Sequence, residues 1–229
     1  MFFKYQKTDK VTSRRKLYKK QITEFRQIAS DVYVLSFPGD FEFTAGQVVA
    51  IDVVSEGVPR LYSIASGEKD ENVDILFDEK SDGKLTPFLS KMNVGDVIYV
   101  SKPFGSFHCD AGDGWFIASG TGVAPFVSMI RSGMNDGKTL IHGGRFDENF
   151  YFSELIENVL GENYIRCASQ EQFTKYYPGR LTQWLREQPV FSKEIKYYLC
   201  GSAEMVVEVR DFLIIKEIPF QNIISETYF

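Results

Sequence analysis

Residues 115–126 read WFIASGTGVAPF, and this stretch decides how the second half of the chain folds. An apolar run leads into two glycines, and residues that can open a helix follow them. Glycines at such a junction let the backbone turn sharply and approach a phosphate, which the N–H groups at the helix start attract. Pro125 suits the first helical turn, where no backbone N–H bond is lost. Residues 120–125 are therefore a candidate phosphate-binding loop, although the proline stands where the usual dinucleotide pattern has glycine.

Strand and helix patterns alternate from this stretch toward residue 229. Further strand-like runs lie at 138–144, 164–169, 196–201 and 222–229, and helical patterns lie at 149–160, 181–188 and 203–216. This alternation predicts a parallel sheet with helices on both faces. Right-handed crossovers would bring the carboxyl ends of the strands to one edge, where ligands of such sheets bind.

The residues before this stretch are rich in short strand-like runs separated by turn residues. Six such runs lie at 19–25, 32–37, 47–54, 61–66, 73–78 and 96–103, and one helical pattern interrupts them at 85–92. Six strands at this spacing predict a small antiparallel barrel. The predicted fold therefore has two domains: a six-stranded antiparallel β-barrel in residues 17–110, and an α/β parallel-sheet domain in residues 111–229, after a basic extension of residues 1–16.

The charge is distributed unevenly along the chain. The 229 residues carry a net charge of −5, but residues 1–20 hold eight Lys or Arg against one Asp. The start of the chain is therefore basic and the remainder acidic. A basic extension of this kind could contact nucleic acid, a membrane surface or an acidic protein, and a solvated extension explains it equally well. Nucleic-acid-binding patterns are lacking, and neither a membrane-spanning run nor a secretory signal is recognisable.

Three cysteines and two histidines limit the possible metal chemistry. Cys109, Cys167 and Cys200 lie far apart and fit neither a disulfide framework nor a zinc or iron–sulfur pattern. His108 and His142 are too few for a histidine-based site. We therefore predict no metal, and thiols kept reduced indicate the cytoplasm.

The strand-like run at residues 60–63, RLYS, combines an arginine with strand-forming residues. Alternation places Arg60 and Tyr62 on one face, and Leu61 and Ser63 on the other. An arginine is costly in a buried strand unless its charge is paired. Either Arg60 has a charged partner, or the strand lies at a sheet edge with this side chain in water.

Two further motifs could contribute to binding. The segment DGKLTPF at 82–88 places Gly83, Lys84 and Thr86 at the start of a short helix, which is a second plausible anion site. In the segment LCGSAEM at 199–205, Cys200 ends a strand at the ligand edge of the predicted sheet, although a buried cysteine more often serves packing alone.

These motifs occur in an order that resembles the ferredoxin–NADP(+) reductase family, in its compact bacterial type, also called flavodoxin reductase. The resemblance covers about residues 17–229 and rests on RLYS, GKLT, GTGVAPF, LCGSAEM and the segment ETYF. It implies that Arg60 pairs with a flavin phosphate, that Tyr62 packs on the isoalloxazine ring and that Ser63 binds near its N5, with Leu61 in the same motif. It further implies that a backbone segment receives the flavin pyrophosphate, which favours FAD over FMN; its residues are Gly83, Lys84, Leu85 and Thr86.

The resemblance also implies where the nicotinamide nucleotide binds. The loop containing Gly120, Thr121 and Gly122 would hold its pyrophosphate, and Cys200 and Gly201 would lie beside the nicotinamide. Ser63, Cys200 and Glu226 would be the catalytic residues around the reactive flavin edge. Tyr228 would stack on the flavin until nicotinamide displaces it, and Phe229 could extend over the adenine.

The expected nucleotide is NADPH, with NADH left open. Arg145, Ser169 and Arg180 match positions that bind the 2′-phosphate of NADP in bacterial members. Gln170 departs from the family, because an arginine is common there. Its loss removes a charge-assisted contact of about 1.5–3 kcal/mol and weakens discrimination against NADH.

The implied function is hydride transfer between NADPH and FAD, and transfer of single electrons between FAD and a small carrier protein, ferredoxin or flavodoxin. Such carriers are acidic, so the basic extension could steer them. An alternative is an NAD(P)H-dependent reductase of free flavin, quinone or an oxygenase component. A flavin-binding subunit without turnover is a third possibility. We expect a monomer or weak dimer that binds neither nucleic acid nor, stably, a membrane.

Overall fold

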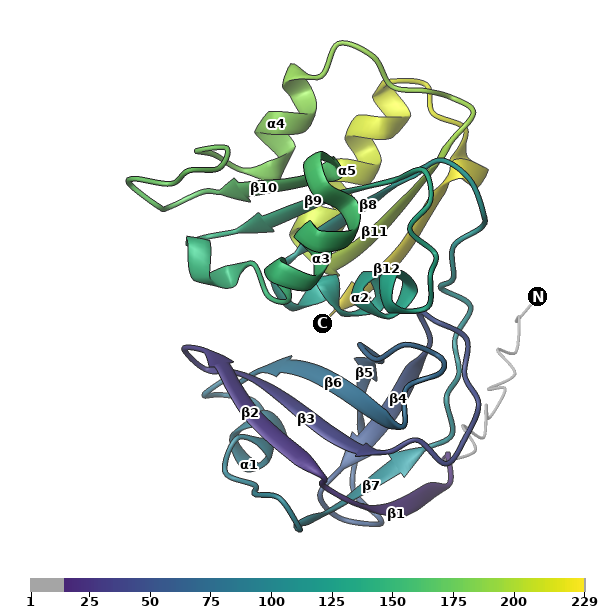
Figure 1. The fold of residues 1–229 in the computed structure, drawn as a ribbon, viewed down its shortest axis with the longest axis vertical. Helices are drawn as coiled ribbons and strands as arrows, with labels where there is room; N and C mark the ends of the chain where they lie inside the picture. Colours follow the sequence, from purple (N-terminus) through teal and green to yellow (C-terminus); the bar gives the residue numbers. More distant parts are fainter. Residues whose placement is uncertain (1–14, 229) are drawn as a thin grey trace, which may run out of the picture.

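The computed structural model describes residues 15–228, which form two domains in contact with each other (Figure 1). Strands β1 to β7 build the first domain and strands β8 to β12 build the second. In the part of the chain that is described, no helix is long and apolar enough to cross a membrane. The predicted two-domain architecture is confirmed.

The first domain consists of two antiparallel sheets around one apolar core. Its strands are β1 (Leu17–Gln21), β2 (Glu24–Ala29), β3 (Val32–Pro38), β4 (Val48–Asp52), β5 (Arg60–Ser63), β6 (Asn72–Asp78) and β7 (Val97–Ser101). One sheet has the order β1-β7-β4-β5 and the other the order β2-β3-β6. Alternating apolar residues of both sheets point inward, among them Leu35, Ile51, Ile75 and Val100.

The domain has seven strands in two sheets rather than the predicted six. The run at 19–25 supplies both β1 and β2, because the chain changes sheets at Ile22 and Thr23. The Ile22 N–H donates to the Asp96 carbonyl on the β7 side, and the Thr23 N–H donates to the Ser36 carbonyl of β3. The helix predicted at 85–92 is shorter, since α1 spans Thr86–Leu89.

The second domain is a five-stranded parallel sheet with the order β10-β9-β8-β11-β12. Its strands are β8 (Gly114–Ser119), β9 (Lys138–Gly144), β10 (Tyr164–Ala168), β11 (Lys196–Ser202) and β12 (Ile223–Tyr228). Its helices are α2 (Ala124–Arg131), α3 (Ser153–Leu160), α4 (Leu181–Glu187) and α5 (Ala203–Ile215), with short 3-10 turns η1 (Gly120–Val123), η2 (Asp147–Asn149), η3 (Gly161–Asn163) and η4 (Phe220–Asn222). The parallel sheet predicted from the sequence is therefore confirmed.

Helices cover both faces of this sheet. Residues of α2 and α3 pack with Phe116, while residues of α4 and α5 pack with its neighbour Ile117, which points to the opposite face. The helix expected at 149–160 begins only at Ser153, because Phe152 has a left-handed backbone with φ of 58° and interrupts it. The chain runs outward in one direction from β8 to β10 and in the other from β11 to β12. This arrangement makes the carboxyl ends of β8 and β11 the switch point where ligands of such sheets bind.

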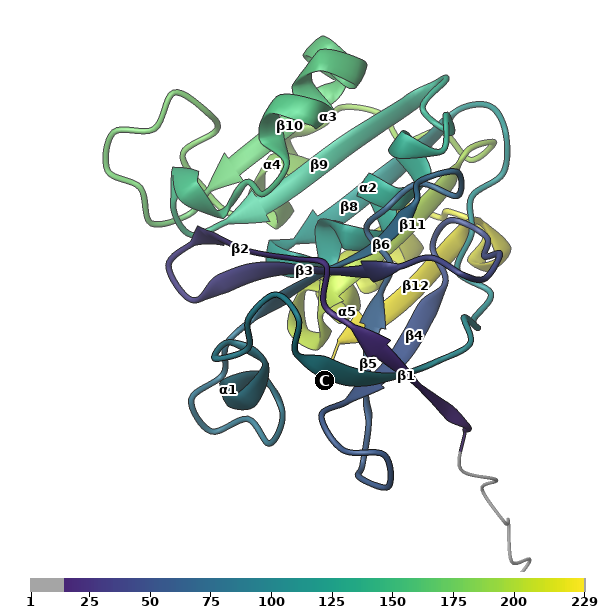
Figure 2. The ribbon, with the colours of Figure 1, turned by 60° about the horizontal axis from the view of Figure 1, so that its bottom comes forward.

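The two domains share an apolar core and an ionic contact. Val34 and Leu76 of the first domain belong to the same buried cluster as Phe126 and Phe116 of the second. Arg131, the last residue of α2, lies with Nη1 2.8 Å from Asp74 Oδ2 and with Nη2 2.7 Å from Asp70 Oδ2. Figure 2 shows the parallel sheet packed against the first domain, with β12 beside β5. This contact fixes the walls of the space between the domains.

Candidate functional site

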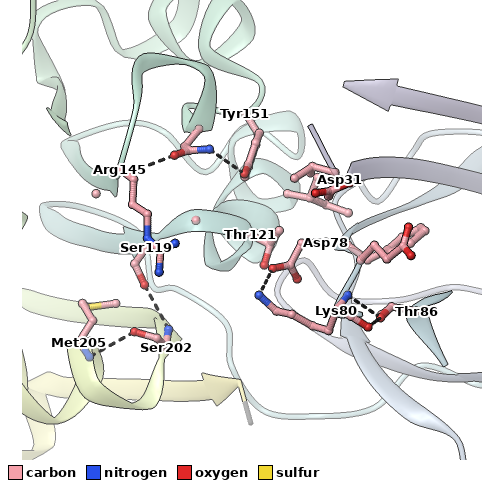
Figure 3. A pocket seen from close by; sticks show the side chains of 18 of the residues that line it. Asp31, Asp78, Lys80, Thr86, Ser119, Thr121, Arg145, Tyr151, Ser202 and Met205 are labelled. Carbon is pink, nitrogen blue, oxygen red and sulfur yellow. Dashed lines mark hydrogen bonds and ion pairs between the residues drawn. The ribbon is translucent and has the colours of Figure 1, made fainter. Parts of the chain in front are cut away.

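A cleft of about 850 Å³ lies between the two domains. Thirteen of the predicted site residues line it: Arg60, Leu61, Tyr62, Ser63, Gly83, Lys84, Leu85, Thr86, Gly120, Thr121, Arg145, Ser169 and Arg180. Figure 3 shows the two walls, with Asp78, Lys80 and Thr86 on one side and Ser119, Thr121 and Arg145 on the other. The structure thus gathers both candidate phosphate segments in one space.

Strand β5 forms part of the first wall, and it decides between the two alternatives for Arg60. Arg60 is exposed and lines the cleft, as expected for a strand at the edge of a sheet. The reason is that β5 is the edge strand of its sheet, paired along its length with β4. Tyr62, on the same face, is half-buried, and burial raises the pKa of its phenol. Its ring packs edge-on against Phe77, with centroids 6.4 Å apart.

The end of β5 meets the last strand of the second domain. The buried Ser63 hydroxyl donates to Glu226 Oε2 at 3.2 Å, which links β5 to β12. Glu226 is half-buried, and this burial raises the pKa of its carboxyl while the Ser63 hydrogen bond opposes the rise. The pair can therefore hold a proton beside the cleft at a higher pH than an exposed carboxyl could.

The segment Gly83–Thr86 forms a tight turn before α1. The Gly83 N–H donates to the Lys80 carbonyl at 2.8 Å, and Thr86 Oγ1 accepts from the Lys80 N–H at 2.9 Å. A Cβ at Gly83 would lie 2.8 Å from Thr86 Oγ1 and 2.9 Å from the Lys80 carbonyl oxygen, so the turn favours glycine there. The turn is held by the chain itself, which leaves the Lys84 side chain available at the cleft.

The glycine loop between β8 and α2 forms the centre of the second wall. Gly120 has φ of 53°, and a Cβ there would meet nothing within 4 Å, so the backbone is open to a ligand. Gly122 has the opposite surroundings, because its Cβ would come 2.4 Å from the Cys200 carbonyl oxygen. Gly201 likewise lies against Ser119, whose Oγ accepts from the Ser202 N–H at 3.1 Å. These two glycines therefore allow the loop and the end of β11 to pack closely.

Several predicted residues do not line the cleft, namely Gly122, Cys200, Gly201 and Glu226. Cys200 is fully buried in the apolar cluster, paired in register with Glu226 of β12. The predicted stacking of Tyr228 concerns a side chain outside the described parts, although its backbone pairs with Ser202. Phe229 lies outside the described residues altogether.

The far end of the cleft carries the residues predicted to select the nucleotide. The Gln170 N–H donates to the Arg145 carbonyl at 2.8 Å, which places both residues at the ends of β9 and β10. Arg180 precedes α4, and its Nη1 lies 3.4 Å from Oε1 of Glu204 in the first turn of α5. This exposed acid was missed from the sequence. It lies directly beside Arg180, a cation predicted to bind the 2′-phosphate.

Sequence reasoning also missed Asp31, Asp78, Lys80 and Tyr151, which line the cleft (Figure 3). Asp31 occupies the turn between β2 and β3 with a left-handed φ of 57°, and Asp78 and Lys80 form an ion pair at the end of β6. The turn residues at 30–31 are the one signal that could have identified this site, because turns carry many binding residues.

The cleft fits two nucleotides by its donor set. Cationic side chains occur in both walls, with Arg60 and Lys84 in one and Arg145 and Arg180 in the other. Each wall also contains a glycine turn, and the backbone at Gly120 is open to a ligand. Among the described residues, no group of three or more His, Cys, Asp or Glu could hold a metal ion.

Two protein-family models match the chain, one in each domain. An oxidoreductase FAD-binding domain matches residues 19–109, and an oxidoreductase NAD-binding domain matches residues 116–211. The chain thus has an FAD-binding and an NAD-binding domain, in that order.

Relatives with named activities cover most of the chain. A ferredoxin–NADP reductase of Pseudomonas aeruginosa is 30% identical over 201 residues, which cover 75% of this chain and 78% of the relative. The electron transfer component of a toluate 1,2-dioxygenase from Pseudomonas putida is 26% identical and covers 92% of this chain and 67% of the relative. A ferredoxin–NADP(+) reductase from Neisseria gonorrhoeae, solved with bound FAD and NADP, has the same fold, with a TM-score of 0.82, 21% identity, and coverage of 93% and 99% of the two chains.

Proposed function

The chain belongs to the ferredoxin–NADP(+) reductase family, in its compact bacterial type, and from that premise we propose that it transfers hydride between NADPH and FAD and single electrons between FAD and ferredoxin or flavodoxin. The observation that carries this proposal is the single cleft that joins the turn at Gly83 to the loop at Gly120. A protein that binds two nucleotides for reaction with each other needs both phosphate sites in one space.

FAD, when bound, supplies the hydride and single-electron chemistry. Arg60 and the turn from Gly83 to Thr86 bind its phosphates in this proposal, and Tyr62 packs against its ring. The half-buried position of Tyr62, with an edge-on contact to Phe77, supports this role because such packing holds the phenol ring in one orientation.

Ser63 and Glu226 are proposed to handle protons at the reactive edge. The Ser63 hydroxyl donates to Glu226 Oε2 and can turn toward another acceptor in the cleft. Burial raises the pKa of Glu226, so its carboxyl can exchange a proton nearer to neutral pH than an ordinary glutamate. Cys200 is paired in register with Glu226 in the sheet, and it is proposed to lie beside the nicotinamide.

The loop residues Gly120 to Gly122 are proposed to bind the nicotinamide nucleotide's pyrophosphate. Arg145, Ser169 and Arg180 are proposed to bind its 2′-phosphate, which would favour NADPH. The departure at Gln170 and the acid at Glu204 weaken that preference in this proposal.

The first domain would comprise residues 17–110 and the second 111–229. The proposed compartment is the cytoplasm, because the three cysteines are spaced too far apart to form a disulfide framework and such thiols are kept reduced there.

A second candidate acceptor is an oxygenase component. It is favoured by the match to the toluate dioxygenase electron transfer component, which spans 92% of this chain. Free flavin and quinone remain further candidates for the acceptor.

Anaerobic reduction tests both the function and the acceptor. We expect the purified yellow protein to lose its visible flavin absorbance on addition of NADPH, faster than with NADH, and then to reduce ferredoxin or flavodoxin on mixing. Retention of flavin colour with both nucleotides would contradict the proposal and favour a binding subunit without turnover. Reduction of added FMN or an oxygenase component, but of neither carrier, would favour the alternative acceptors.

The basic extension is proposed to steer an acidic carrier. Deletion of residues 1–16 should slow carrier reduction at low salt and flatten its dependence on ionic strength. An unchanged salt dependence would remove the extension from the proposal.

A further inference from the structure

His142 lies in the middle of β9, fully buried, and the proposed function leaves it without a role. Both of its ring nitrogens have polar neighbours. Nε2 lies 3.1 Å from the carbonyl oxygen of Gly120, in the phosphate-binding loop, and Nδ1 lies 3.1 Å from the hydroxyl of Tyr164 on β10. The His142 side chain therefore connects strand β10 to the loop that follows β8.

The neighbours of His142 determine which nitrogen carries the proton. Burial lowers the pKa of His142 to about 4, so the ring is neutral at physiological pH and has one N–H. The Gly120 carbonyl can only accept, which assigns that N–H to Nε2. Nδ1 must then accept from the Tyr164 hydroxyl, which keeps its proton because burial raises the pKa of this phenol.

Peptide geometry extends this contact to the cleft. The peptide between Gly120 and Thr121 is planar and trans, so its carbonyl and its N–H point in opposite directions. The carbonyl points toward His142 in the core, and the Thr121 N–H therefore points away from the core, toward the cleft that Thr121 lines. As a donor in the first turn of η1, this N–H has no partner within the turn.

We propose that His142 is a positioning residue for the nicotinamide nucleotide, which holds the Gly120–Thr121 peptide so that the Thr121 N–H faces the pyrophosphate. The inference rests on the proposed function, because it takes the loop to be the pyrophosphate site. Gly120 has φ of 53° and open space around it, so its own packing does little to fix this peptide. The hydrogen bond from His142 adds a restraint from the core to the hydrogen bonds of η1 itself.

Packing alone is the competing explanation for His142. Its ring lies 5.4 Å from that of Phe150 and 6.3 Å from that of Tyr164, in an aromatic group that a phenylalanine could complete. The two explanations differ in what they expect of that substitution. Phenylalanine would preserve the packing but remove the hydrogen bond that the imidazole donates to the Gly120 carbonyl.

Calorimetric binding to the FAD-loaded protein separates them. The ligands are NADP(+), which has a pyrophosphate, and 2′-AMP, which has the adenosine and the 2′-phosphate without it. We expect His142→Phe to weaken NADP(+) binding about tenfold, or about 1.4 kcal/mol, and to leave 2′-AMP binding and the flavin content unchanged. His142→Gln should restore most of the NADP(+) affinity, because its amide can donate to Gly120 and accept from Tyr164.

Tyr164→Phe provides a second, milder variant. It keeps the ring but removes the hydroxyl that fixes the His142 proton on Nε2, so NADP(+) binding should weaken less than in His142→Phe and 2′-AMP binding should not change. This variant carries the test if His142→Phe does not fold. Unchanged NADP(+) affinity in the variants, or equal weakening of NADP(+) and 2′-AMP, would overturn the inference. A wild-type protein that binds 2′-AMP and FAD but not NADP(+) would instead overturn the proposed function of the loop.

Discussion

Ser63 and Glu226 lie 163 positions apart in the chain, and their side chains meet across the boundary of the two domains at 3.2 Å. The contact joins the edge strand of the first domain to the last strand of the second. It places a carboxyl with a raised pKa next to the motif expected to bind the flavin ring. Because the Glu226 carboxyl titrates, the contribution of this pair to stability can be measured as a function of pH.

Glu226→Gln should raise thermal stability at neutral pH. Burial raises the folded-state pKa of Glu226 above its unfolded value, so the ionised carboxyl destabilises the fold as pH rises from the unfolded pKa toward the folded one and beyond. The amide cannot ionise and escapes this cost. Melting temperatures should differ at pH 7 and converge below the unfolded pKa of about 4.3. A difference that is independent of pH would contradict this explanation, and Ser63→Ala serves as a control that keeps the carboxyl.

Arg131→Met should destabilise the contact between the domains. Its guanidinium is 26% exposed and pairs with Asp74, which is 10% exposed and also accepts from Ser36 Oγ at 2.7 Å. Removal of the cation leaves a largely buried carboxylate, and with partial solvent screening we expect a loss of about 2 kcal/mol in unfolding free energy. This corresponds to a fall in melting temperature of about 4–8 °C. Arg131→Lys should lose less, and an unchanged melting temperature would show that the pair contributes nothing.

Glu204→Gln should raise the preference for NADPH over NADH. The carboxylate lies 3.4 Å from Arg180, where it neutralises a cation proposed to bind the 2′-phosphate. Both side chains are exposed, so the gain should be modest, about two- to fivefold in the ratio of kcat/KM for the two nucleotides. Glu208→Gln is the matched control, because Glu208 also lines the cleft from α5 but pairs with Arg186. An equal gain in both variants would indicate a general charge effect instead.

Gln170→Arg should shift the same ratio further. Gln170 lines the cleft beside Arg145, to whose carbonyl its N–H donates. An arginine there would add a charge-assisted contact to the 2′-phosphate, and we expect KM for NADPH to fall about tenfold with little change for NADH. Steady-state kinetics with both nucleotides measure this. A parallel fall for NADH would show that the added charge attracts the pyrophosphate rather than the 2′-phosphate.

The sequence predicted the second domain closely, because its strands and helices have distinct periodicities. The helices expected at 181–188 and 203–216 are present with nearly the expected bounds. The exception is the start of the helix at Ser153, where the left-handed backbone of Phe152 interrupts a continuous apolar pattern. A positive φ at a phenylalanine has no sequence signal, since tertiary packing imposes it.

The first domain was harder to predict because its two sheets share one alternating pattern. The transfer from β1 to β2 at Ile22 keeps the alternation and leaves no mark in the sequence. The exposure of Arg60 was also undetermined, because RLYS reads the same in an edge strand as in a central one. The position of β5 in the sheet decided it.

The cleft could be predicted only in part. Motif residues such as those at 83–86 and 120–122 are recognisable because glycine and a helix start occur together. Asp31, Tyr151 and Glu204 belong to no motif and reach the cleft only through tertiary packing. The sequence gives the charge and hydrogen-bonding groups of these side chains, but it does not show that they lie in the cleft.

Helix α2 has the glycine loop at one end and Arg131, bound to Asp70 and Asp74, at the other. Its eight residues span about 12 Å, over which an α-helix is stiff. If the first domain slides against the second, α2 should therefore move as a rigid body and displace the glycine loop. Nucleotide affinity in this protein should thus depend on how the two domains are aligned.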